Sequence, residues 1–302
     1  MRTARLIVNP VAGAGRTLKR WPQIRDHLKS LGLRFDHDFT EAPRHAIELA
    51  RAAARKGYEM VVSVGGDGTI NEVVNGLYDS GTLGDVSLGI ISTGTGSDYI
   101  RTVGLPASYH DACQRLPDAR QVRVDLGVVE YGGTSTPGRR LFVNFAGLGF
   151  DAEVVRATTQ RFKRLGGFPA YLLGLLTTFL CYRNRELTVT VDDRSVTRKV
   201  CTIVMSNGKY GGGSMFVAPE ADLTDGLLDV MTIGDIGKLD LLWSLPRIYR
   251  GTHLTHPRVS LQRSSQVEIT SASPMPIQAD GELVGETPAR FHVMPLALTL
   301  LV

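Results

Sequence analysis

Short apolar runs alternate with amphipathic stretches in the N-terminal part of the chain. Met60–Val64 is continuously apolar, which is typical of a strand buried on both faces of a parallel sheet. An apolar helix face follows, beginning at Ile70 and recurring at i+3, i+4 and i+7. The same alternation predicts strands at 6–9, 34–40 and 88–91 and helices at 16–31 and 43–56. Strands that alternate with helices indicate a parallel sheet covered on both faces.

The pattern changes after Pro117. Strand-like segments separated by turn signals follow, at 122–129, 140–146, 187–192, 200–205, 227–233, 267–270 and 290–299. We therefore expect a doubly wound α/β domain over residues 1–122. A mostly antiparallel β-sandwich domain is expected over residues 123–302. With two domains, a cleft between them is the default place for an active site.

One segment breaks the β pattern. Residues 165–182 carry no charge, and basic residues bracket them: Arg161, Lys163, Arg164, Arg183 and Arg185. The segment is at the short limit for a membrane span and contains Pro169 and three glycines. Two interpretations stay open. The segment is a helix packed on the β domain, or it lines an apolar substrate cleft or docks on a bilayer surface.

Composition narrows the setting. The chain has 302 residues, 43% of them hydrophobic, and a formal net charge of +4, too small to argue for a nucleic-acid partner. Its three cysteines, Cys113, Cys181 and Cys201, show neither a disulfide framework nor a zinc spacing. We expect a reducing, cytoplasmic setting, and the N-terminus does not have the pattern of a signal peptide.

The chemistry is concentrated where the strand at 60–64 meets its helix. Glycines 65, 66 and 68 let a phosphate approach the backbone, and the unpaired N–H groups of a helix N-terminus bind anions. Asp67 places a carboxylate beside that site, which suits a metal ion or a reacting proton. Asp98 follows a second glycine-rich strand end, so we expect Asp67 to organise Mg²⁺ and the transferring phosphoryl group with Asp98 as its partner.

Several motifs occur in one order along nearly the whole chain. They are Asn9-Pro10 with Gly13, Gly65-Gly66-Asp67-Gly68-Thr69, Gly94-Thr95-Gly96-Ser97-Asp98, Ala218–Gly226 and Asp280-Gly281-Glu282. In these motifs the chain resembles the diacylglycerol kinase-like lipid kinases. The Gly-Gly-Asp-Gly element alone is shared with phosphofructokinases and NAD kinases, and the later motifs separate the lipid kinases from those. One departure is Ser97, where the family usually has Asn.

The resemblance implies an α/β nucleotide domain and a β-sandwich with ATP and Mg²⁺ between them. Positions that match the family's nucleotide contacts are Asn9, Pro10, Val11, Ala12, Gly13, Thr40, Gly65, Gly66, Asp67, Gly68, Thr69, Ile70, Asn71, Glu72 and Thr95. It also favours a structural Mg²⁺ held by Asp222, Asp225 and the backbone carbonyl of Leu227, which are hard oxygen ligands in a tight loop. Without the resemblance, an ordinary Asp-Gly turn would be the better interpretation there.

Asp280 and Glu282 are predicted to supply the general base. They are two residues apart, so on an extended strand they would share a face. An Asp-Gly pair is also a common hairpin turn, and sequence alone does not separate these interpretations. The family places catalytic carboxylates here. The resemblance leans to Glu282 as proton acceptor with Asp280 in the catalytic network.

The expected function is ATP-dependent phosphorylation of a hydroxyl of a membrane lipid such as diacylglycerol. Two alternatives stay open: a kinase of a soluble hydroxyl substrate, similar to NAD kinase or phosphofructokinase, and a nucleotide-binding regulator without catalysis. The expected location is the cytoplasm, peripherally on the inner face of the membrane. A homodimer is left open.

Overall fold

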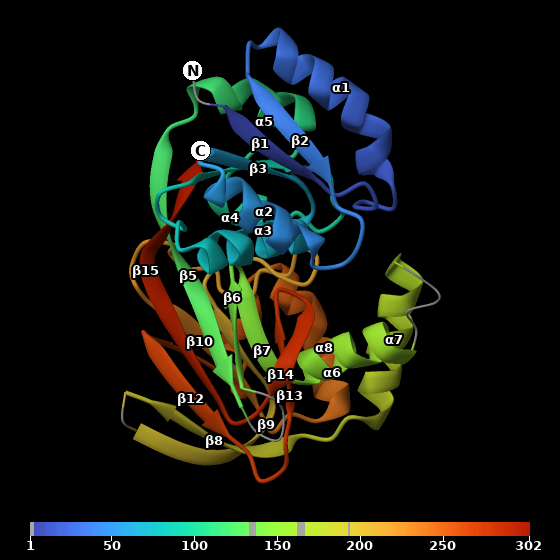
Figure 1. Ribbon diagram of the computed structural model, residues 1–302. Coiled ribbons are helices and arrows are strands. Elements are labelled where there is room, and N and C mark those ends of the chain that lie inside the picture. The colour runs from blue at the N-terminus through green and yellow to red at the C-terminus, as the bar shows by residue number, and fades with distance from the viewer. Residues whose placement is uncertain (1–2, 133–136, 162–166, 193) are drawn as a thin grey trace. The chain divides into compact units, whose positions relative to one another are not determined.

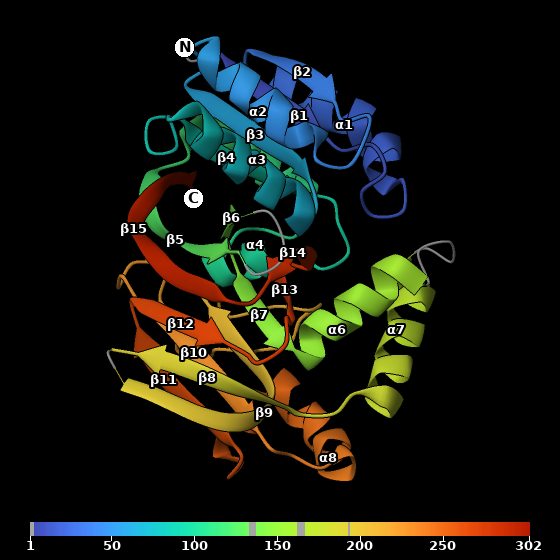
Figure 2. The same cartoon turned by 60° about the horizontal axis from the view of Figure 1, so that its bottom comes forward.

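The computed structural model describes residues 3–132, 137–161, 167–192 and 194–302. The chain divides into two compact units (Figures 1 and 2). Unit 1 comprises Met1–Leu126, Gly212–Ser214 and Pro295–Val302, and unit 2 comprises Gly127–Gly211 and Met215–Met294. The predicted boundary between residues 122 and 123 stays a prediction.

Unit 1 is built on a parallel sheet. Its strands are β1 (Ala4–Val8), β2 (Phe35–Phe39), β3 (Met60–Gly65), β4 (Ser87–Ser92) and the end of β15 (Ala289–Leu301). They are ordered β2-β1-β3-β4-β15, and each of these neighbours pairs in parallel. The helices are α1 (Arg16–Ser30), α2 (His45–Arg55), α3 (Asp67–Ser80), α4 (Asp98–Val103) and α5 (Tyr109–Arg115).

Helices cover both faces of this sheet. Every residue of β3 and β4 is buried, which an open face would not allow. On one face Trp21 and Ile24 of α1 and Ala112 of α5 pack with side chains of β1 and β3. Helices α2 and α3 contact each other on the other face. The predicted doubly wound α/β arrangement is therefore confirmed.

Unit 2 is mostly antiparallel. Its strands are β5 (Gln121–Tyr131), β6 (Gly138–Phe142), β7 (Phe145–Gly149), β8 (Arg185–Val191), β9 (Arg194–Ser206), β10 (Leu228–Gly234), β11 (Val259–Ser264), β12 (Gln266–Thr270), β13 (Pro276–Ala279), β14 (Glu282–Glu286) and the start of β15. The order β14-β13-β7-β9-β8-β12-β15 runs through it, with β10 paired to β9 and β11 paired to β10. Its apolar core includes Phe142, Leu187, Val230 and Phe291.

Three helices accompany these strands: α6 (Phe150–Arg156), α7 (Gly167–Cys181) and α8 (Lys238–Tyr249). The uncharged segment 165–182 thus forms α7, while Lys163, Arg164, Leu165 and Gly166 lie outside the described residues. Among the residues described, the helices are all too short or too polar to cross a membrane. Helices α6 and α8 were not predicted.

The predicted strand at 140–146 is wrong as a single element. It divides into β6 and β7 at Val143 and Asn144. The backbone N–H groups of these two residues donate to the side chain of Asp280. Because those donors point at a carboxylate, they are lost to a strand ladder, and the strand breaks there.

Candidate active site

Two glycine-rich turns touch at the carboxyl ends of β3 and β4. Gly66 is the N-cap of α3, and the N–H of Thr93 donates to the carbonyl of Gly65 over 2.8 Å. A Cβ placed on Gly94 would lie 2.6 Å from the Cα of Gly66, closer than real Cβ atoms come. The two turns therefore meet backbone to backbone, and N–H groups of a helix start are left free of side-chain cover.

The turn after β1 joins the same edge. The Asn9 amide donates from Nδ2 to Thr69 Oγ1 over 3.0 Å, and its Oδ1 accepts from the N–H of Val11 at 3.2 Å. Gly13 adopts a φ of 60°, in the left-handed region that favours glycine. The three turns leave backbone groups open in a space that a side chain larger than that of glycine would fill. Such a space, which we call the glycine cradle, suits the phosphates of a nucleotide.

Arg16 is a site residue that the sequence analysis did not select. Its Nε donates to the carbonyl of Gly13 over 2.9 Å, and its Nη2 donates to that of Gly94 over 3.3 Å. The exposed guanidinium thus ties two of the three turns together and leaves positive charge beside them. Its position at the start of α1, directly after a glycine turn, was the available signal.

Not every predicted nucleotide contact can reach a ligand with its side chain. Ile70 and Asn71 are each 1% exposed, so their side chains belong to the interior of unit 1. The Glu72 carboxylate caps the start of α2, accepting from the N–H of Arg44 at 2.9 Å and of Ala46 at 3.1 Å. Of the other predicted residues, Pro10, Ala12 and Thr95 lie in the turns, Thr40 directly follows β2, and Gly68 lies in the first turn of α3.

Asp67 and Asp98 lie side by side, as their predicted partnership requires. The Asp67 carboxylate accepts from the N–H of Asp98 at 3.2 Å and of Tyr99 at 3.1 Å, so it caps α4. Asp98 is 5% exposed. Its carboxylate accepts from the N–H groups of Gly213 and Ser214, both at 2.8 Å.

The two carboxylates differ in their electrostatic surroundings, because Asp98 Oδ1 also forms an ion pair with Arg101 Nη1 at 3.1 Å. Burial raises the pKa of Asp67, its hydrogen bonds from Tyr99 and Asp98 oppose that rise, and the charge of Asp98 adds to it. A Cβ on Gly96 would lie 2.9 Å from Asp67 Oδ2 and 3.8 Å from Asp98 Oδ2. Both carboxylates therefore border the same small space beside the backbone of Gly96.

The Asp280–Gly281 turn in unit 2 is a hairpin between β13 and β14. Both residues have positive φ, 47° and 85°, as a type I′ turn requires. Asp280 Oδ2 accepts from the N–H of Val143 at 2.7 Å, and Oδ1 accepts from Asn144 at 3.0 Å and Phe145 at 3.1 Å. This carboxylate fixes the β6–β7 junction.

Glu282 is held differently. Its Oε2 accepts from Nη2 of Arg140 over 3.0 Å, and the two side chains are 39% and 7% exposed. The prediction that Asp280 and Glu282 share a strand face is wrong, because Asp280 lies in the turn rather than on β14. The two carboxylates have different partners, and both residues are half-buried.

A buried polar chain behind this turn was missed. Gln278 of β13 is 1% exposed; its Nε2 donates to Asp151 Oδ2 over 3.0 Å, and its Oε1 accepts from the N–H of Gly281 at 2.9 Å. Thr202 donates to Asp151 Oδ1 over 2.6 Å. Burial raises the pKa of Asp151 despite these donors. No motif links these residues along the sequence.

The predicted metal residues form two adjacent turns. Asp222 Oδ1 accepts from the N–H and the hydroxyl of Thr224, at 2.9 and 2.7 Å, and Asp225 Oδ1 accepts from the N–H of Leu227 at 3.0 Å. Both carboxylates are exposed. Within the described ranges, no three His, Cys, Asp or Glu side chains gather into a metal cluster. Two carboxylates and a carbonyl are nonetheless the hard oxygen donors that Mg²⁺ prefers.

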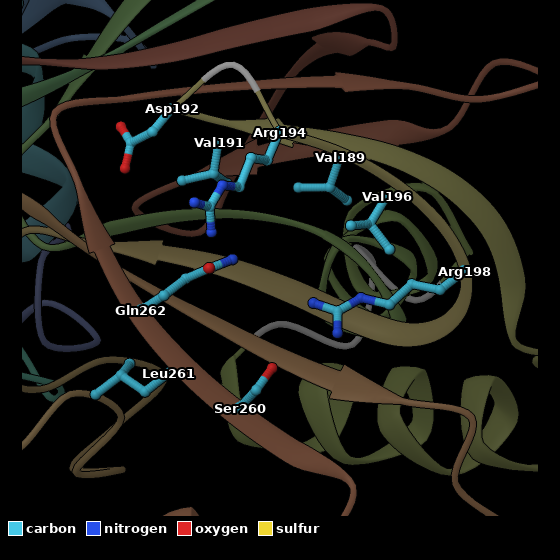
Figure 3. Close-up of a pocket in the computed structure, with 9 residues that line it drawn as sticks. All are labelled: Val189, Val191, Asp192, Arg194, Val196, Arg198, Ser260, Leu261 and Gln262. Atoms are coloured by element: carbon cyan, nitrogen blue, oxygen red, sulfur yellow. The ribbon is translucent and has the colours of Figure 1, made fainter.

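Unit 2 also contains a cavity of about 580 Å³ that includes none of these residues. Figure 3 shows its lining, with Val189 and Val196 beside Arg194 and Arg198. The cavity lies between the β8–β9 hairpin and β11 and is open to solvent beside exposed Arg194. No residue of the sequence motifs contributes to it.

Glycine-rich turns beside the Asp67 and Asp98 carboxylates on a doubly wound unit, together with a β-rich second unit, define the class of two-unit α/β-plus-β proteins. A family model described as the diacylglycerol kinase catalytic domain matches residues 3–129. A second, described as the YegS C-terminal NAD kinase beta sandwich-like domain, matches residues 144–302, more than half of the chain. The chain belongs to the diacylglycerol kinase-like family.

Similar proteins carry the same designation. A diacylglycerol kinase of Staphylococcus carnosus (strain TM300) is 27% identical over 290 residues, covering 96% of this chain and 92% of that protein. One of Bacillus subtilis (strain 168) is 26% identical over 292 residues, covering 96% and 93%. The crystal structure of a diacylglycerol kinase from Bacillus anthracis str. Sterne has a TM-score of 0.72 at 18% identity, covering 99% and 96%. The last likeness supports the fold alone.

Proposed function

We propose that this protein transfers the γ-phosphoryl group of ATP to a hydroxyl of a membrane lipid such as diacylglycerol. The observation that carries the proposal is the Asp67–Asp98 pair at the edge of the glycine cradle. Carboxylates beside glycine-rich turns are suited to phosphoryl transfer, which depends mainly on positioning and on neutralising charge. Membership of the diacylglycerol kinase-like family supports a lipid as the acceptor.

In the proposed reaction the acceptor oxygen attacks the γ-phosphorus as the bond to the β–γ bridging oxygen breaks, and ADP leaves. The backbone N–H groups of the three turns hold the phosphates, and Arg16 adds positive charge beside them. The hydroxyl proton passes to a carboxylate of the Asp280–Glu282 turn. Asp280 accepts three backbone N–H bonds, and Glu282 is paired with Arg140.

Magnesium enters at two places in this proposal. Asp67 and Asp98 are the residues that would hold the ion that accompanies ATP, and Asp222, Asp225 and the carbonyl of Leu227 would hold a structural one. Bound Mg²⁺ supplies positive charge that offsets the charge of the phosphate oxygens. The donor chemistry fits, since all these ligands are oxygen atoms.

The acceptor resides in a bilayer, so we infer that the protein works peripherally on the cytoplasmic face of a membrane. Helix α7 supports this, because four of its leucines expose between 39% and 69% of their surface: Leu172, Leu173, Leu176 and Leu180. A helix that only closed a core would bury these side chains.

The decisive experiment uses radiolabelled ATP with purified protein, Mg²⁺ and separate acceptors. Labelled phosphatidic acid from diacylglycerol is expected. A labelled sugar or dinucleotide instead would favour a kinase of soluble substrates. ATP binding without transfer to any acceptor would favour a non-catalytic regulator. Either of the last two results overturns the proposal.

A second experiment identifies the proton acceptor. Asp280→Asn and Glu282→Gln are compared over a pH series, with folding checked by circular dichroism. The variant that lacks the base loses at least about 10²-fold in turnover and also loses the acid limb of the pH–rate profile. Two fully active variants would remove this turn from the mechanism.

A further inference from the structure

Helix α8 packs on unit 2 through Ile248 and carries a second apolar face on the outside. None of its residues is buried. Leu239 is 74% exposed, Leu242 49%, Trp243 82% and Tyr249 56%, and together with Pro246 they recur at i, i+3, i+4, i+7 and i+10. That spacing is one face of a helix. A helix of a soluble domain turns such a face toward the core, so this one lacks its partner in the chain.

The exposed leucines of α7 lie next to this face. The Lys238 ammonium at the start of α8 donates to the carbonyl of Leu180 near the end of α7. Asn184, just beyond α7, donates from Nδ2 to Asp235 Oδ1 over 2.8 Å and to the carbonyl of Ile236 over 2.9 Å. These bonds fix the end of α7 against the start of α8.

The other ends of the two helices also approach each other. Burial raises the pKa of Tyr171, near the start of α7, and the charge of Tyr249, at the end of α8, adds to that rise. Tyr171 and Tyr249 are therefore near enough for their charges to interact. Figures 1 and 2 both place the two helices on the same side of unit 2, away from β12. We call the apolar area they share the α7–α8 surface; it comprises Leu172, Leu173, Leu176, Leu180, Leu239, Leu242, Trp243 and Tyr249.

Positive charge borders the α7–α8 surface. Arg183 follows α7, and Arg247 and Arg250 lie at the end of α8. No ion pair joins these three to a carboxylate in the part of the chain that the structure describes. The acids nearby are engaged: Asp235 with Lys199 at 3.5 Å, and Asp240 with His256 at 3.1 Å.

We propose that the α7–α8 surface docks on an anionic lipid bilayer, with Trp243 entering the boundary between headgroups and acyl chains. An apolar helix face bordered by arginines is the design of an interfacial helix, and Trp favours that boundary. A second copy of the chain would bring the same arginines against each other, which disfavours self-association through this face. The inference rests on the proposed function, since a lipid acceptor is what brings the protein to a bilayer.

The fluorescence of Trp243 can report directly on docking of the α7–α8 surface. The chain has two tryptophans, and Trp21 is 5% exposed in the core of unit 1. The difference in emission between the wild type and Trp243→Phe therefore reports on Trp243. Vesicles of phosphatidylcholine with phosphatidylglycerol are added without ATP or diacylglycerol. We expect the Trp243 emission to move to shorter wavelength, and lipids brominated on their acyl chains to quench it. Vesicles of phosphatidylcholine alone should produce a weaker shift, as should high salt.

Substitutions then test the surface. Trp243→Ser and Leu242→Ser should each weaken vesicle co-sedimentation by roughly tenfold, because each removes a large apolar group from the lipid contact. Arg247→Gln with Arg250→Gln should weaken binding only to anionic vesicles. Leu18→Ser and Val196→Ser are matched controls, as both side chains are exposed, 54% and 52%, and lie outside the α7–α8 surface. The thermal unfolding temperature should be unchanged in all of them.

Three results would overturn the inference. The first is an unchanged Trp243 emission on anionic vesicles. The second is equal loss of binding in the control variants. The third is a dimer in lipid-free solution that Trp243→Ser converts to a monomer, which would assign the face to a second copy. The proposed function can fail independently of the surface. Vesicle binding without phosphorylation of diacylglycerol would refute only the proposed function. Phosphorylation of a short-chain, water-soluble diacylglycerol without vesicle binding would refute only the docking surface.

Discussion

The side-chain amide of Gln278 joins the carboxylate of Asp151 to the hairpin that carries Asp280 and Glu282. Its Nε2 donates to Asp151 over 3.0 Å, and its Oε1 accepts from the N–H of Gly281 at 2.9 Å. One amide thus satisfies a buried acceptor and a turn donor at once. Because the turn has positive φ at both central residues, such a contact helps to keep it in register.

We predict that Gln278→Met lowers activity more than stability alone explains. Methionine keeps the volume but leaves Asp151 and the N–H of Gly281 without this partner, which should cost about 1–3 kcal/mol in unfolding free energy. Thr202→Val is the matched control, since it also removes a donor to Asp151 and leaves the turn untouched. Denaturant unfolding and turnover are measured together. When the two variants lose equal stability, the kcat of Gln278→Met should be at least about tenfold lower than that of Thr202→Val. Equal kcat for the two variants would refute the positioning role.

Asp151 should make stability depend on pH in an unusual direction. Burial raises its pKa in the folded state above the ordinary value of about 3.9. Between these two values the folded state binds more protons than the unfolded state, so its contribution to stability is lost as pH rises. Asp151→Asn keeps acceptor and donor groups toward Gln278 and Thr202 and cannot ionise. The unfolding free energy of the wild type, relative to Asp151→Asn, should therefore fall as the pH rises above 4. A constant difference would show that Asp151 does not titrate in this way.

Substitutions at Asp67 and Glu72, both in α3, distinguish a chemical role of a carboxylate from a role in capping a neighbouring helix. Asp67→Asn keeps an acceptor for the start of α4 but removes the charge, and we expect a loss of at least about 10²-fold in turnover. Glu72→Gln weakens the cap of α2 and should cost about 1 kcal/mol of stability, with turnover nearly unchanged. Steady-state kinetics and unfolding curves decide the matter. Near wild-type turnover in Asp67→Asn would show that this carboxylate serves only as a cap.

Local pattern was enough to predict most of the fold. Continuous apolar runs predicted β3 and β4 because both are buried on every side, and turn glycines predicted where the strands end. Helix α8 was missed although its apolar positions recur with a helical period, and it contains Pro246, which helix interiors rarely accommodate. Periodicity identifies an apolar helix face, but it does not say whether that face meets a core or solvent.

The site was predictable only where its residues are close in sequence. Asp67 and its glycines form one turn, so their chemistry can be read from a few positions. The partners of Asp280 at 143–145, by contrast, are about 135 residues away, and Thr299 pairs with Ser87 across an even longer separation. Such contacts depend on how the strands assemble, and no local spacing encodes them. The division of 140–146 into β6 and β7 has the same origin.

The turns at Asp222 and Asp225 should bind a divalent cation. Both carboxylates are exposed, and Leu227 offers a backbone carbonyl in the same loop. We expect an anomalous scattering peak in this loop when crystals contain Mn²⁺, and at least about tenfold weaker Mn²⁺ binding in Asp222→Asn with Asp225→Asn. Glu220→Gln is the control, because Glu220 lies in the loop but faces Arg263 at 3.6 Å. An empty loop at saturating Mn²⁺ would contradict the prediction.

Ser97→Asn should stabilise the protein. Ser97 has a φ of 56°, in the left-handed region that costs a residue with a Cβ about 1–2 kcal/mol, whereas Asn adopts it readily. Its hydroxyl bonds to that of Ser92 over 2.9 Å, and losing this bond offsets part of the gain. We expect a net rise of about 0.5–1 kcal/mol in unfolding free energy. Ser97→Gly relieves the same strain, whereas Ser97→Ala keeps the strain and loses the hydrogen bond to Ser92. We therefore expect Ser97→Asn to be more stable than the wild type, and Ser97→Gly to be more stable than Ser97→Ala. If Ser97→Asn is no more stable than Ser97→Ala, backbone conformation does not limit stability at this turn.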